Sequence, residues 1–313
     1  MSKRKAIFLV FLGAILILLV VLGLKINRYL SPANIQSSNG RVNILILGIG
    51  GKGHAGEDLT DTMIVASVSL TKPSLVFVSL PRDIWIPAIR AKINSAYYWG
   101  GFDLAKISTQ GVVGLPINYA MVMDFSGFTK IINVLGGVTV NVERSFTDEN
   151  YPIEGRENDV CGGDPLFRCR YETVSFTQGL TTMDGETALK FARSRYAKGD
   201  EGTDLARAAR QEKIIQAVKN KLLSKDFFLY PKKALAVWQV VKDSVQTDLG
   251  TNALAILAER ALVGRNNIVQ TTLPESLLIN PPISKTYDLQ YVFVPAGGSW
   301  DQVHIWINGL IKN

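Results

Sequence analysis

Two kinds of hydrophobic pattern alternate along the chain from residue 42 onward. Short runs that are wholly or mainly apolar predict β-strands at 42–48, 62–70, 74–80, 118–124 and 138–142. The second and third runs flank a Thr-Lys-Pro turn, which predicts that they pair as a hairpin. Two later runs, at 267–273 and 289–294, predict closing strands, whereas 143–180 is rich in Asp, Glu, Gly and Pro and predicts a long loop.

Apolar residues spaced three or four positions apart predict helices between these strands. In chain order the helices cover 102–113, 125–137, 184–195, 203–224, 230–245, 250–263 and 299–311. Asp184 is a suitable N-cap for the third of them. Strands and helices that interleave in this way predict a layered α/β domain, with a mixed β-sheet flanked by helices.

Residues 6–24 form one longer stretch of 19 uncharged, almost wholly apolar positions, which is enough to span a bilayer as a helix. A cleaved signal peptide is the alternative, but the stretch is long for one and no small-x-small site follows it closely. The basic residues before it favour a cytoplasmic N-terminus. We therefore predict a single-pass protein of the cell membrane, with a cytoplasmic tail and transmembrane helix at 1–28, a linker at 29–40 and an extracytoplasmic domain at 41–313.

Composition narrows the chemistry that the chain can perform. The formal net charge of +7 suits an anionic partner, whether a phosphate-rich polymer, lipid headgroups or nucleic acid. Two histidines and two cysteines argue against most zinc sites and against a histidine-based catalytic triad. Cys161 and Cys169 lie in a loop rich in Gly and Pro, so outside the cytosol they are expected to form a loop-closing disulfide, with two free thiols as the alternative.

The segment 190–213 holds four arginines: Arg193, Arg195, Arg207 and Arg210. In a helix that begins near Thr203, one face carries first charged or polar and then apolar residues, namely Asp204, Arg207, Gln211, Ile215, Val218 and Leu222. Apolar stripes face cores, so the charged part of this face is predicted to point inward, where arginines need an anion. Arg193 and Arg195 alternate upstream and would share one side of an extended segment. A solvated basic helix is the alternative.

The glycine-rich segment after the first strand spells G-x-G-x-x-G at Gly48, Gly50 and Gly53. A dinucleotide-binding fold needs a helix that opens at the third glycine. Here no helical apolar spacing follows the glycines, and the chain runs straight into the strand at 62–70. We therefore exclude that fold and interpret the segment as a flexible loop.

The same loop carries three carboxylates, Glu57, Asp58 and Asp61, to the edge of a strand. Clustered carboxylates with no sulfur and little imidazole suit a hard cation such as Mg²⁺. A solvated acidic turn is the alternative.

Two pairs of polar residues follow the third predicted strand. Arg82 and Asp83 stand at its end, a usual place for site residues in open α/β sheets, and Lys92 and Asn94 come shortly after. Each pair alone is as consistent with a structural role as with a functional one. Together with the arginines at 193, 195 and 207, they would provide the cations that phosphoryl transfer requires, and nearby carboxylates could hold a metal or accept a proton.

An aromatic group, Trp85, Tyr97, Tyr98 and Trp99, lies in the same region. We interpret these residues as core and rim, with a platform that stacks on sugar rings as the alternative. His304 lacks any partner pattern and is interpreted as a surface or loop residue.

Several motifs together resemble one protein family. They are DTM after a glycine-rich loop, VSLPRD, KINSAY, MDFSGFTKIINVLGGVTVNV, and MDGETALKFARSR followed by D-L-A-R-x-x-R-Q. Their order and spacing, from about Asn43 to Lys213, are similar to those of the LytR–CpsA–Psr family. Beyond residue 224 the similarity is general.

The resemblance implies an activity as well as a fold. Members are anchored in the membrane, face outward, and transfer glycopolymers from a polyprenyl-pyrophosphate carrier to peptidoglycan, with Mg²⁺ as cofactor. Their α/β fold encloses a hydrophobic tunnel for the lipid chain. The expected partners are therefore a polyprenyl-pyrophosphate-linked glycan as donor, peptidoglycan as acceptor and the membrane, and not nucleic acid.

The resemblance also implies roles for residues of this sequence. Pyrophosphate binding is implied for Arg82, Arg193, Arg195 and Arg207, with support from Lys92, Asn94 and Gln211. Asp61 is implied as a Mg²⁺ ligand, with Asp58 as a second candidate. Asp204 would shape the site, and Asp83 or Asp61 would take the proton of the attacking hydroxyl.

Two positions depart from the family pattern. Members commonly carry Asp where this chain has Gly50 and Arg where it has Leu59, so one metal ligand and one phosphate ligand are missing. The candidates to replace them are Lys52, His54, Glu57 and Asp58. These departures motivate two alternative functions: a non-catalytic, membrane-anchored protein that binds polyanions or lipid pyrophosphate, and a secreted pyrophosphatase that acts on the polyprenyl-pyrophosphate linkage with water as acceptor.

Overall fold

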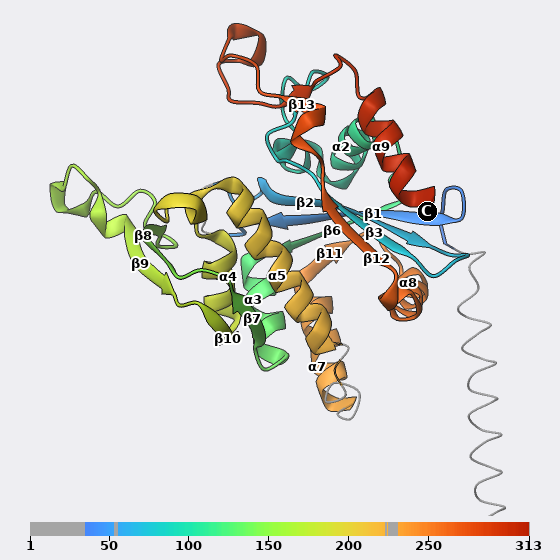
Figure 1. The fold of residues 1–313 in the computed structure, drawn as a ribbon, viewed down its shortest axis with the longest axis horizontal. Helices are drawn as coiled ribbons and strands as arrows, with labels where there is room; N and C mark the ends of the chain where they lie inside the picture. Colours follow the sequence, from blue (N-terminus) through green and yellow to red (C-terminus); the bar gives the residue numbers. More distant parts are fainter. Residues whose placement is uncertain (1–34, 53–55, 223, 225–230, 313) are drawn as a thin grey trace, which may run out of the picture.

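A six-stranded mixed β-sheet organises the fold in a computed structural model that describes residues 35–52, 56–222, 224 and 231–312. Across the sheet the order is β11 (Val245–Thr247), β6 (Tyr119–Asp124), β1 (Arg41–Ile49), β2 (Thr60–Ser69), β3 (Leu75–Ser79) and β12 (Ile268–Thr272). β6 runs parallel to β1 and β12 runs parallel to β3, while the other neighbours are antiparallel. The predicted mixed α/β fold and the β2–β3 hairpin are thus confirmed (Figure 1).

The two faces of the sheet bury different side chains, because successive residues of a strand point to opposite sides. On one face, side chains such as Leu47 pack against α2 (Ala96–Val113) and α9 (Asp301–Lys312). On the other face, side chains such as Ile44 pack against α8 (Thr251–Val263). Figure 1 shows α2 and α9 on one side of the sheet and α8 on the other, so the sheet is the middle layer.

A second group of elements packs beside the sheet around its own core. It comprises α3 (Phe125–Val134), β7 (Val138–Val142), β8 (Phe146–Pro152), β9 (Tyr171–Phe176), β10 (Gly179–Met183), α4 (Gly185–Arg193) and α5 (Asp204–Leu222). β7 pairs with β10 and β8 pairs with β9, both antiparallel. Phe146, Phe176 and Phe191 meet at the centre of this core, with ring centroids between 5.0 and 6.0 Å apart. Because α3 follows β6 directly, this lobe is joined to the sheet where β6 ends.

The remaining elements are α7, which packs against α3, and a set of short pieces. The helix is α7 (Pro231–Ser244), and the short strands are β4 (Trp85–Ile86), β5 (Ala91–Lys92), β13 (Leu278–Ile279) and β14 (Val294–Pro295). Single 3₁₀ turns lie at Ile93–Ser95, Cys161–Gly163, Arg168–Arg170, Gly199–Gly202, Gly264–Asn266, Glu275–Leu277 and Lys285–Tyr287. Each helix predicted from the apolar spacing is present. α2 begins six residues earlier than predicted, and a break at Gly100 and Gly101 separates its first turn from the predicted part.

The segment 143–180 is not the long loop that the sequence predicted, because β8, β9 and the start of β10 lie in it. Asp148 makes β8 hard to recognise in the sequence, because its side chain is buried at a position where the strand alternation calls for an apolar residue. A register shift between Asp148 and Tyr151 then moves the following residues out of phase. The residues between β8 and β9, 153–170, are the part of this segment that matches the prediction.

The apolar run 289–294 does not form a closing strand of the central sheet, which corrects the second closing strand that we predicted. Its end enters β14, which pairs with β13 over two residues. The backbone of Phe293 accepts a hydrogen bond from the Trp85 amide at 2.9 Å and donates one to the Asp83 carbonyl at 2.9 Å. The run therefore fixes the segment that follows β3 instead of extending the sheet.

The predicted membrane segment lies outside the described residues. Among the residues that the structure describes, no helix is both long and apolar enough to cross a bilayer. The boundaries at 1–28, 29–40 and 41–313 therefore stay predictions.

Candidate functional site

Residues from distant parts of the chain meet at the sheet edge where β1, β3 and β6 end. Ile49, the last residue of β1, pairs with Asp124 at the end of β6 and with Thr60 at the start of β2. Asp61 is the next residue of β2, and Arg82 follows shortly after β3. The topology thus places Asp61, Arg82 and the start of α3 at one edge, a common location for binding sites in open α/β sheets.

The glycine-rich loop between β1 and β2 turns back on itself at this edge. The amide of Gly51 donates to the Glu57 carbonyl at 2.9 Å. A Cβ at Gly51 would lie 2.8 Å from the Asp124 side chain, and its φ is +85°, so only glycine fits this close approach. The loop is followed by β2, antiparallel to β1, and not by a helix, which confirms the exclusion of a dinucleotide-binding fold.

Asp61, Arg82, Asp83 and Lys92 form a linked group of charges, which we call the Arg82 cluster. Arg82 Nη1 donates to Asp61 Oδ1, and Arg82 Nε lies 3.7 Å from Asp83 Oδ2. Lys92 Nζ donates to Asp83 Oδ1 at 2.6 Å. The amide of Asn94 donates to the Arg82 carbonyl at 3.3 Å, so the pairs at 82–83 and 92–94 do converge. The Arg82, Asp83 and Lys92 side chains are each about a quarter exposed, so a ligand can reach them.

Arg193 approaches the same edge from the end of α4. This helix begins at the predicted N-cap, since the Asp184 side chain accepts from the Thr187 amide at 2.8 Å. At the other end, the Arg193 guanidinium lies 4.1 Å from the ring centroid of Phe125, the first residue of α3 after β6. The Tyr151 hydroxyl accepts from Arg193 Nη1 at 3.4 Å. Two aromatic side chains therefore orient Arg193 beside the end of β6.

Tyr151 is a functional candidate that sequence reasoning missed, because it lies in β8 within the segment predicted as loop. Burial raises the pKa of Tyr151 to about 12, and the positive charge of Arg193 opposes the shift without cancelling it. The hydroxyl is therefore neutral at physiological pH. It can orient Arg193 but is not a base for the reaction.

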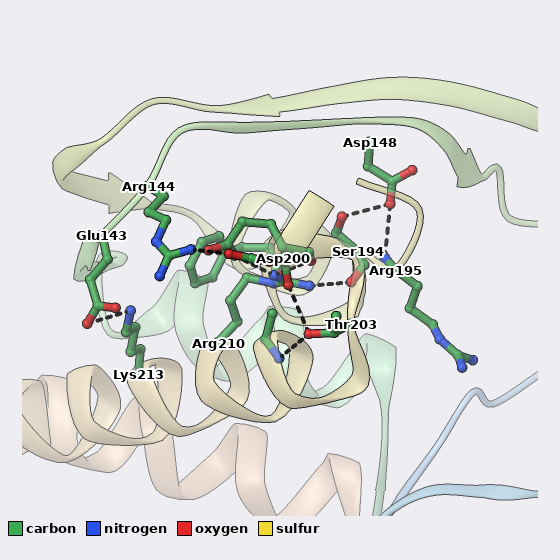
Figure 2. Close-up of polar contacts among 12 residues, drawn as sticks. Glu143, Arg144, Asp148, Ser194, Arg195, Asp200, Thr203, Arg210 and Lys213 are labelled. Atoms are coloured by element: carbon green, nitrogen blue, oxygen red, sulfur yellow. Dashed lines mark hydrogen bonds and ion pairs between the residues drawn. The ribbon is translucent and has the colours of Figure 1, made fainter. Parts of the chain in front are cut away.

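Asp148, which the sequence did not single out either, fixes the segment that carries Arg195. Its Oδ2 accepts from Ser194 Oγ at 2.7 Å and from the Arg195 and Tyr196 amides at 3.0 and 3.1 Å. Burial acts to raise the pKa of Asp148, but these hydrogen bonds, with one from the Asn150 amide, outweigh burial and lower the pKa below its ordinary value. Figure 2 shows the Arg195 side chain extending away from Asp148.

Arg193 and Arg195 do not both lie in an extended segment, which corrects the backbone that our prediction assumed. Arg193 is the last residue of α4, and Ser194 is its C-cap with φ −51° and ψ 133°. The chain changes direction between the two arginines. The prediction fails because it assumed a strand-like backbone at both positions.

Arg210 is the arginine of this stretch that points into the core (Figure 2), with a side chain that is 3% exposed. Its Nε donates to the Phe191 carbonyl at 3.0 Å, and its Nη2 donates to the Ser194 carbonyl. Nη1 donates to Glu201 Oε2 at 3.0 Å, and the guanidinium lies 4.8 Å from the ring centroid of Phe146. Burial lowers the pKa of Arg210, and Glu201 opposes that shift. Arg210 thus ties α5 to the end of α4 and is not available to a ligand.

The inward face of α5 is therefore displaced by one residue from the predicted face. Among the α5 side chains that the structure describes, Arg210, Ile214 and Ala217 are buried. Ile215, which we predicted to be inside, is 41% exposed. Arg207 and Gln211 are half-buried at the border of this face. The Asp204 side chain is not among those that the structure describes, so its role stays a prediction.

The carboxylates of Asp61 and Asp58 are the candidates to hold a cation here. Oxygen donors without sulfur or imidazole fit Mg²⁺, which commonly binds one or two carboxylates and completes its shell with water and substrate phosphate. Within the described residues, the one group of three potential ligands within 4.8 Å is Asp159, Cys161 and Cys169. Its cysteines form the predicted disulfide, so the free-thiol alternative is wrong. The Asp61 site fits Mg²⁺ in donor type, with phosphate oxygens needed to complete it.

Comparison with known proteins reveals the family. A family model described as LytR_cpsA_psr matches residues 25–304. The chain belongs to the LytR–CpsA–Psr family. The polyisoprenyl-teichoic acid–peptidoglycan teichoic acid transferase TagU of Enterococcus faecalis is 29% identical over 282 residues, which cover 82% of this chain and 84% of that protein. TagU of Oceanobacillus iheyensis is 33% identical over 237 residues, which cover 72% of this chain and 65% of that protein.

Solved structures show the same fold in proteins of lower identity. Bacillus subtilis TagV aligns with a TM-score of 0.62 at 23% identity, covering 88% of this chain and 99% of that one. A structure described as TagT bound to LI-WTA aligns with a TM-score of 0.58 at 19% identity, covering 90% of this chain and 96% of that one. The layered α/β architecture of this LytR–CpsA–Psr protein is therefore shared with both.

Proposed function

We propose that this protein is a phosphotransferase that moves a glycopolymer from a polyprenyl-pyrophosphate carrier to peptidoglycan. The observation that carries the proposal is the convergence, at one sheet edge, of the Arg82 cluster with Arg193, which rests on Phe125. Guanidinium forks and an ammonium group suit the non-bridging oxygens of a pyrophosphate. Membership of the LytR–CpsA–Psr family, and the names of the teichoic acid transferases that resemble this chain, support the same substrate class.

A half-buried apolar strip on the sheet supports a lipid-linked donor. Ile46 of β1 pairs with Ile64 of β2 and with Met121 of β6, and all three side chains are only partly buried. Phe77 of β3 belongs to the same face, which is the face that α8 covers at its other end. The strip leads along β1 toward the edge near Arg82. A polyprenyl chain lying on it would bring its pyrophosphate to the cations.

The proposed reaction is an in-line displacement at the phosphorus next to the glycan. The oxygen of a peptidoglycan sugar hydroxyl forms a bond to that phosphorus, the bond from phosphorus to the bridging oxygen breaks, and polyprenyl phosphate leaves. The hydroxyl proton passes to a carboxylate of the site, Asp61 or Asp83. Arg82, Lys92 and Arg193 hold the non-bridging oxygens and offset the negative charge that grows on them in the transition state.

Further residues at this edge are proposed to complete the site. Asp61 and Asp58 would hold Mg²⁺ beside the pyrophosphate, where a bound divalent cation supplies additional charge neutralisation. Arg195, just after α4, and Arg207, on α5, are proposed to bind the same anion from the side of Arg193.

We also propose that residues 1–28 anchor the domain in the cell membrane, with the N-terminus in the cytoplasm. The long apolar stretch after a basic N-terminus supports an anchor of this orientation. The disulfide between Cys161 and Cys169 is in keeping with a domain outside the cytosol. On that side of the membrane, a lipid-linked donor and peptidoglycan are both within reach.

A transfer assay tests the proposal with the full-length protein in lipid vesicles. The donor is a radiolabelled polyprenyl-pyrophosphate disaccharide and the acceptor is insoluble peptidoglycan. The wild-type protein is expected to fix label on the peptidoglycan and to release polyprenyl phosphate in equal amount. Arg82→Ala and Arg193→Ala are expected to lower the rate by ~10²–10³ each. Arg144→Ala, from an exposed pair with Asp200, is the control that should keep full activity. Transfer by Arg193→Ala at the wild-type rate would contradict the assigned roles.

The same assay separates the two alternative functions. Release of polyprenyl phosphate without labelled peptidoglycan would identify a pyrophosphatase that uses water as acceptor. Donor binding without any turnover would identify a binding protein, which the glycine and leucine at Gly50 and Leu59 would then explain.

A further inference from the structure

Tyr98 and Trp99 project from the first turn of α2 into solvent, and the proposed reaction leaves them unused. Tyr98 is 61% exposed and Trp99 is 54% exposed. The other two aromatic residues of this group are packed. Trp85 is buried and makes an edge contact with Tyr287, and Tyr97 packs on Phe102 with ring centroids 5.5 Å apart. The aromatic group found in the sequence therefore divides into a packed pair and an open pair.

The backbone links the open pair to the Arg82 cluster. The turn that carries the pair begins two residues after Asn94, whose amide donates to the Arg82 carbonyl. From Asn94 to Trp99 the chain advances by five residues, which is about 7–8 Å along a helix axis. This distance is on the scale of one or two sugar rings. A glycan whose phosphate is bound by Arg82 and Lys92 would therefore have a ring within reach of Tyr98 and Trp99.

Tyr97, next to the open pair, ties the turn to the other wall of the site. Its hydroxyl donates to Gln246 Oε1 of β11 at 3.5 Å. Burial raises the pKa of Tyr97, and the negative charge of Asp58 raises it further, so the turn also borders the loop that carries the candidate metal ligand. The turn that carries the open pair thus joins the segment of Asn94 to β11 and to the loop of Asp58.

Two glycines set this turn apart from the rest of α2. Gly100 has φ −145° and ψ 22°, and Gly101 has φ 57° and ψ −149°, so the helix is broken between residue 99 and residue 102. The Gly101 conformation is open to glycine almost alone. A Cβ at Gly100 would lie 2.5 Å from the Leu104 side chain. The break therefore separates the turn with the two exposed rings from the following helix.

We propose that Tyr98 and Trp99 form a carbohydrate subsite that stacks on a sugar ring of the glycan bound at the pyrophosphate site. The inference rests on the proposed function. The C–H faces of pyranose rings are apolar while their edges carry hydroxyls, so an exposed Tyr–Trp pair beside a charged pocket matches both parts of such a ligand. Aromatic residues also gather at membrane interfaces, but these two stand next to the Arg82 cluster, where the glycan has to pass.

Steady-state kinetics with full-length protein in vesicles test the subsite. The substrates are a polyprenyl-pyrophosphate disaccharide and soluble peptidoglycan tetrasaccharides. Trp99→Ala is expected to raise the KM for one of them about tenfold, with a larger effect for the double variant with Tyr98→Ala and near-wild-type values for Trp99→Phe. The KM that rises tells whether the ring belongs to the donor or to the acceptor. Ile107→Ala, 68% exposed on the same helix, is the matched control.

Unchanged KM values for both substrates in the double variant would overturn the inference. A double variant whose main defect is weaker binding to glycan-free vesicles would overturn it as well, because the two rings would then contact lipid and not sugar. Direct binding keeps this result separate from the proposed function. NMR titrations with the tetrasaccharide and with the disaccharide diphosphate of the donor are expected to show weaker binding of one of the two ligands to Trp99→Ala than to the wild type, whether or not transfer is observed. Equal binding of both ligands by the two proteins would also reject the subsite, while a wild-type protein that binds the sugars but transfers nothing would reject only the proposed reaction.

Discussion

Arg193 and Arg210 show, within one short stretch, two different uses of a guanidinium. Arg210 is buried, and its N–H groups are satisfied by backbone carbonyls and by Glu201. Arg193 instead rests on the ring of Phe125 at the edge of the sheet. A charged side chain can enter a core when protein acceptors meet it. An inward-pointing arginine therefore indicates an anion site only where the protein itself does not supply acceptors for its N–H groups.

The ring of Phe125 is expected to matter for activity because it orients Arg193. Phe125→Leu removes the cation–π contact and is predicted to lower kcat/KM for transfer about fivefold, which corresponds to ~1 kcal/mol for such a contact. Tyr151→Phe deletes one long hydrogen bond of 3.4 Å and should change kcat/KM less. A Phe125→Leu protein with wild-type kcat/KM would show that Arg193 needs no such platform.

Arg210 is expected to matter for stability and not through contact with substrate. Arg210→Met leaves the Phe191 and Ser194 carbonyls and Glu201 without their donor, so the free energy of unfolding should fall by about 3 kcal/mol. Urea denaturation followed by circular dichroism measures this. Arg144→Ala breaks an exposed ion pair on the same lobe and should cost less than about 1 kcal/mol. Similar losses in the two variants would refute the structural role of Arg210.

Asp148 is expected to make stability depend on pH. Its pKa is lowered in the folded protein, so its contribution is present above the unfolded-state pKa of about 3.9 and is lost as the pH falls through the folded-state value. Asp148→Asn should therefore destabilise the protein by about 2 kcal/mol at pH 7. The difference between variant and wild type should shrink below about pH 4. Unfolding curves at several pH values decide this, and a pH-independent difference would contradict it.

The residues of the candidate site differ in whether the sequence alone could predict them. Arg82 and Lys92 could be found because a strand end and the next loop place charges at a sheet edge. Tyr151 and Asp148 could not, since both act through neighbours that are far away in the sequence, and Asp148 itself obscures the strand on which it lies. Their partners follow from tertiary packing, which no local pattern encodes.

At the scale of elements, the crossing of α3 and α4 determines where Arg193 lies. The first residue of α4, Gly185, touches the backbone of α3, since a Cβ there would lie 2.3 Å from the Thr129 carbonyl oxygen. The amide of Gly185 also donates to Asn133 Oδ1 at 2.8 Å. The close approach holds the two helices together, so Phe125 on one and Arg193 on the other stay in contact.

Gly185→Ala is predicted to separate the two helices and to lower the free energy of unfolding by about 2 kcal/mol or more, because backbone atoms cannot move aside. Activity should fall further than stability explains, since Arg193 moves away from Phe125. Gly111→Ala is the matched control: it lies within α2 with open space around its Cβ position and should stabilise the protein by ~0.5–1 kcal/mol. Equal stability of the two variants would contradict the close packing.

Most helices and strands could be predicted from hydrophobic periodicity, but the buried face of α5 and the pairing of distant strands could not. The five early strands and the helices follow from apolar spacing, because a buried stripe has to repeat with the period of the backbone. On α5 the stripe was placed one residue too late, since Arg210 occupies a core position that the pattern reserves for an apolar residue. Pairing of β12 with β3 joins segments almost two hundred residues apart and had no local signal.

At the scale of the whole molecule, the candidate site exists only when both lobes are in place. The Arg82 cluster belongs to the sheet, while Arg193, Arg195 and Arg207 come from the second lobe. Cationic side chains that converge on one anion site repel each other unless an anion or carboxylates lie between them. The ion pair of Asp61 with Arg82 offsets part of this positive charge before any ligand arrives.

Removal of divalent cations should therefore affect activity without affecting the fold. EDTA is predicted to abolish transfer, and added Mg²⁺ is predicted to restore it, while the Tm changes little because, without donor phosphate, Asp61 pairs with Arg82 and retains the cation only weakly. Asp61→Asn should raise the Mg²⁺ concentration needed for half-maximal rate. Calorimetry and transfer assays on the same samples check both parts, and full activity of the EDTA-treated protein would rule out the metal.

The order of strands also determines when, during synthesis or export, the inner strands stop exposing unpaired backbone to other chains. β11 and β12, the two outer strands, both come from the last third of the chain, while the four inner strands all precede residue 125. Until 245–247 and 268–272 have emerged during synthesis or export, β6 and β3 offer unpaired backbone to other chains. A chain that is released early, or cut before residue 245, would contain every residue of the Arg82 cluster and would still expose two unpaired strand edges. Protection of these strands from pairing with other chains thus depends on the final seventy residues, which complete the sheet that the first hundred begin.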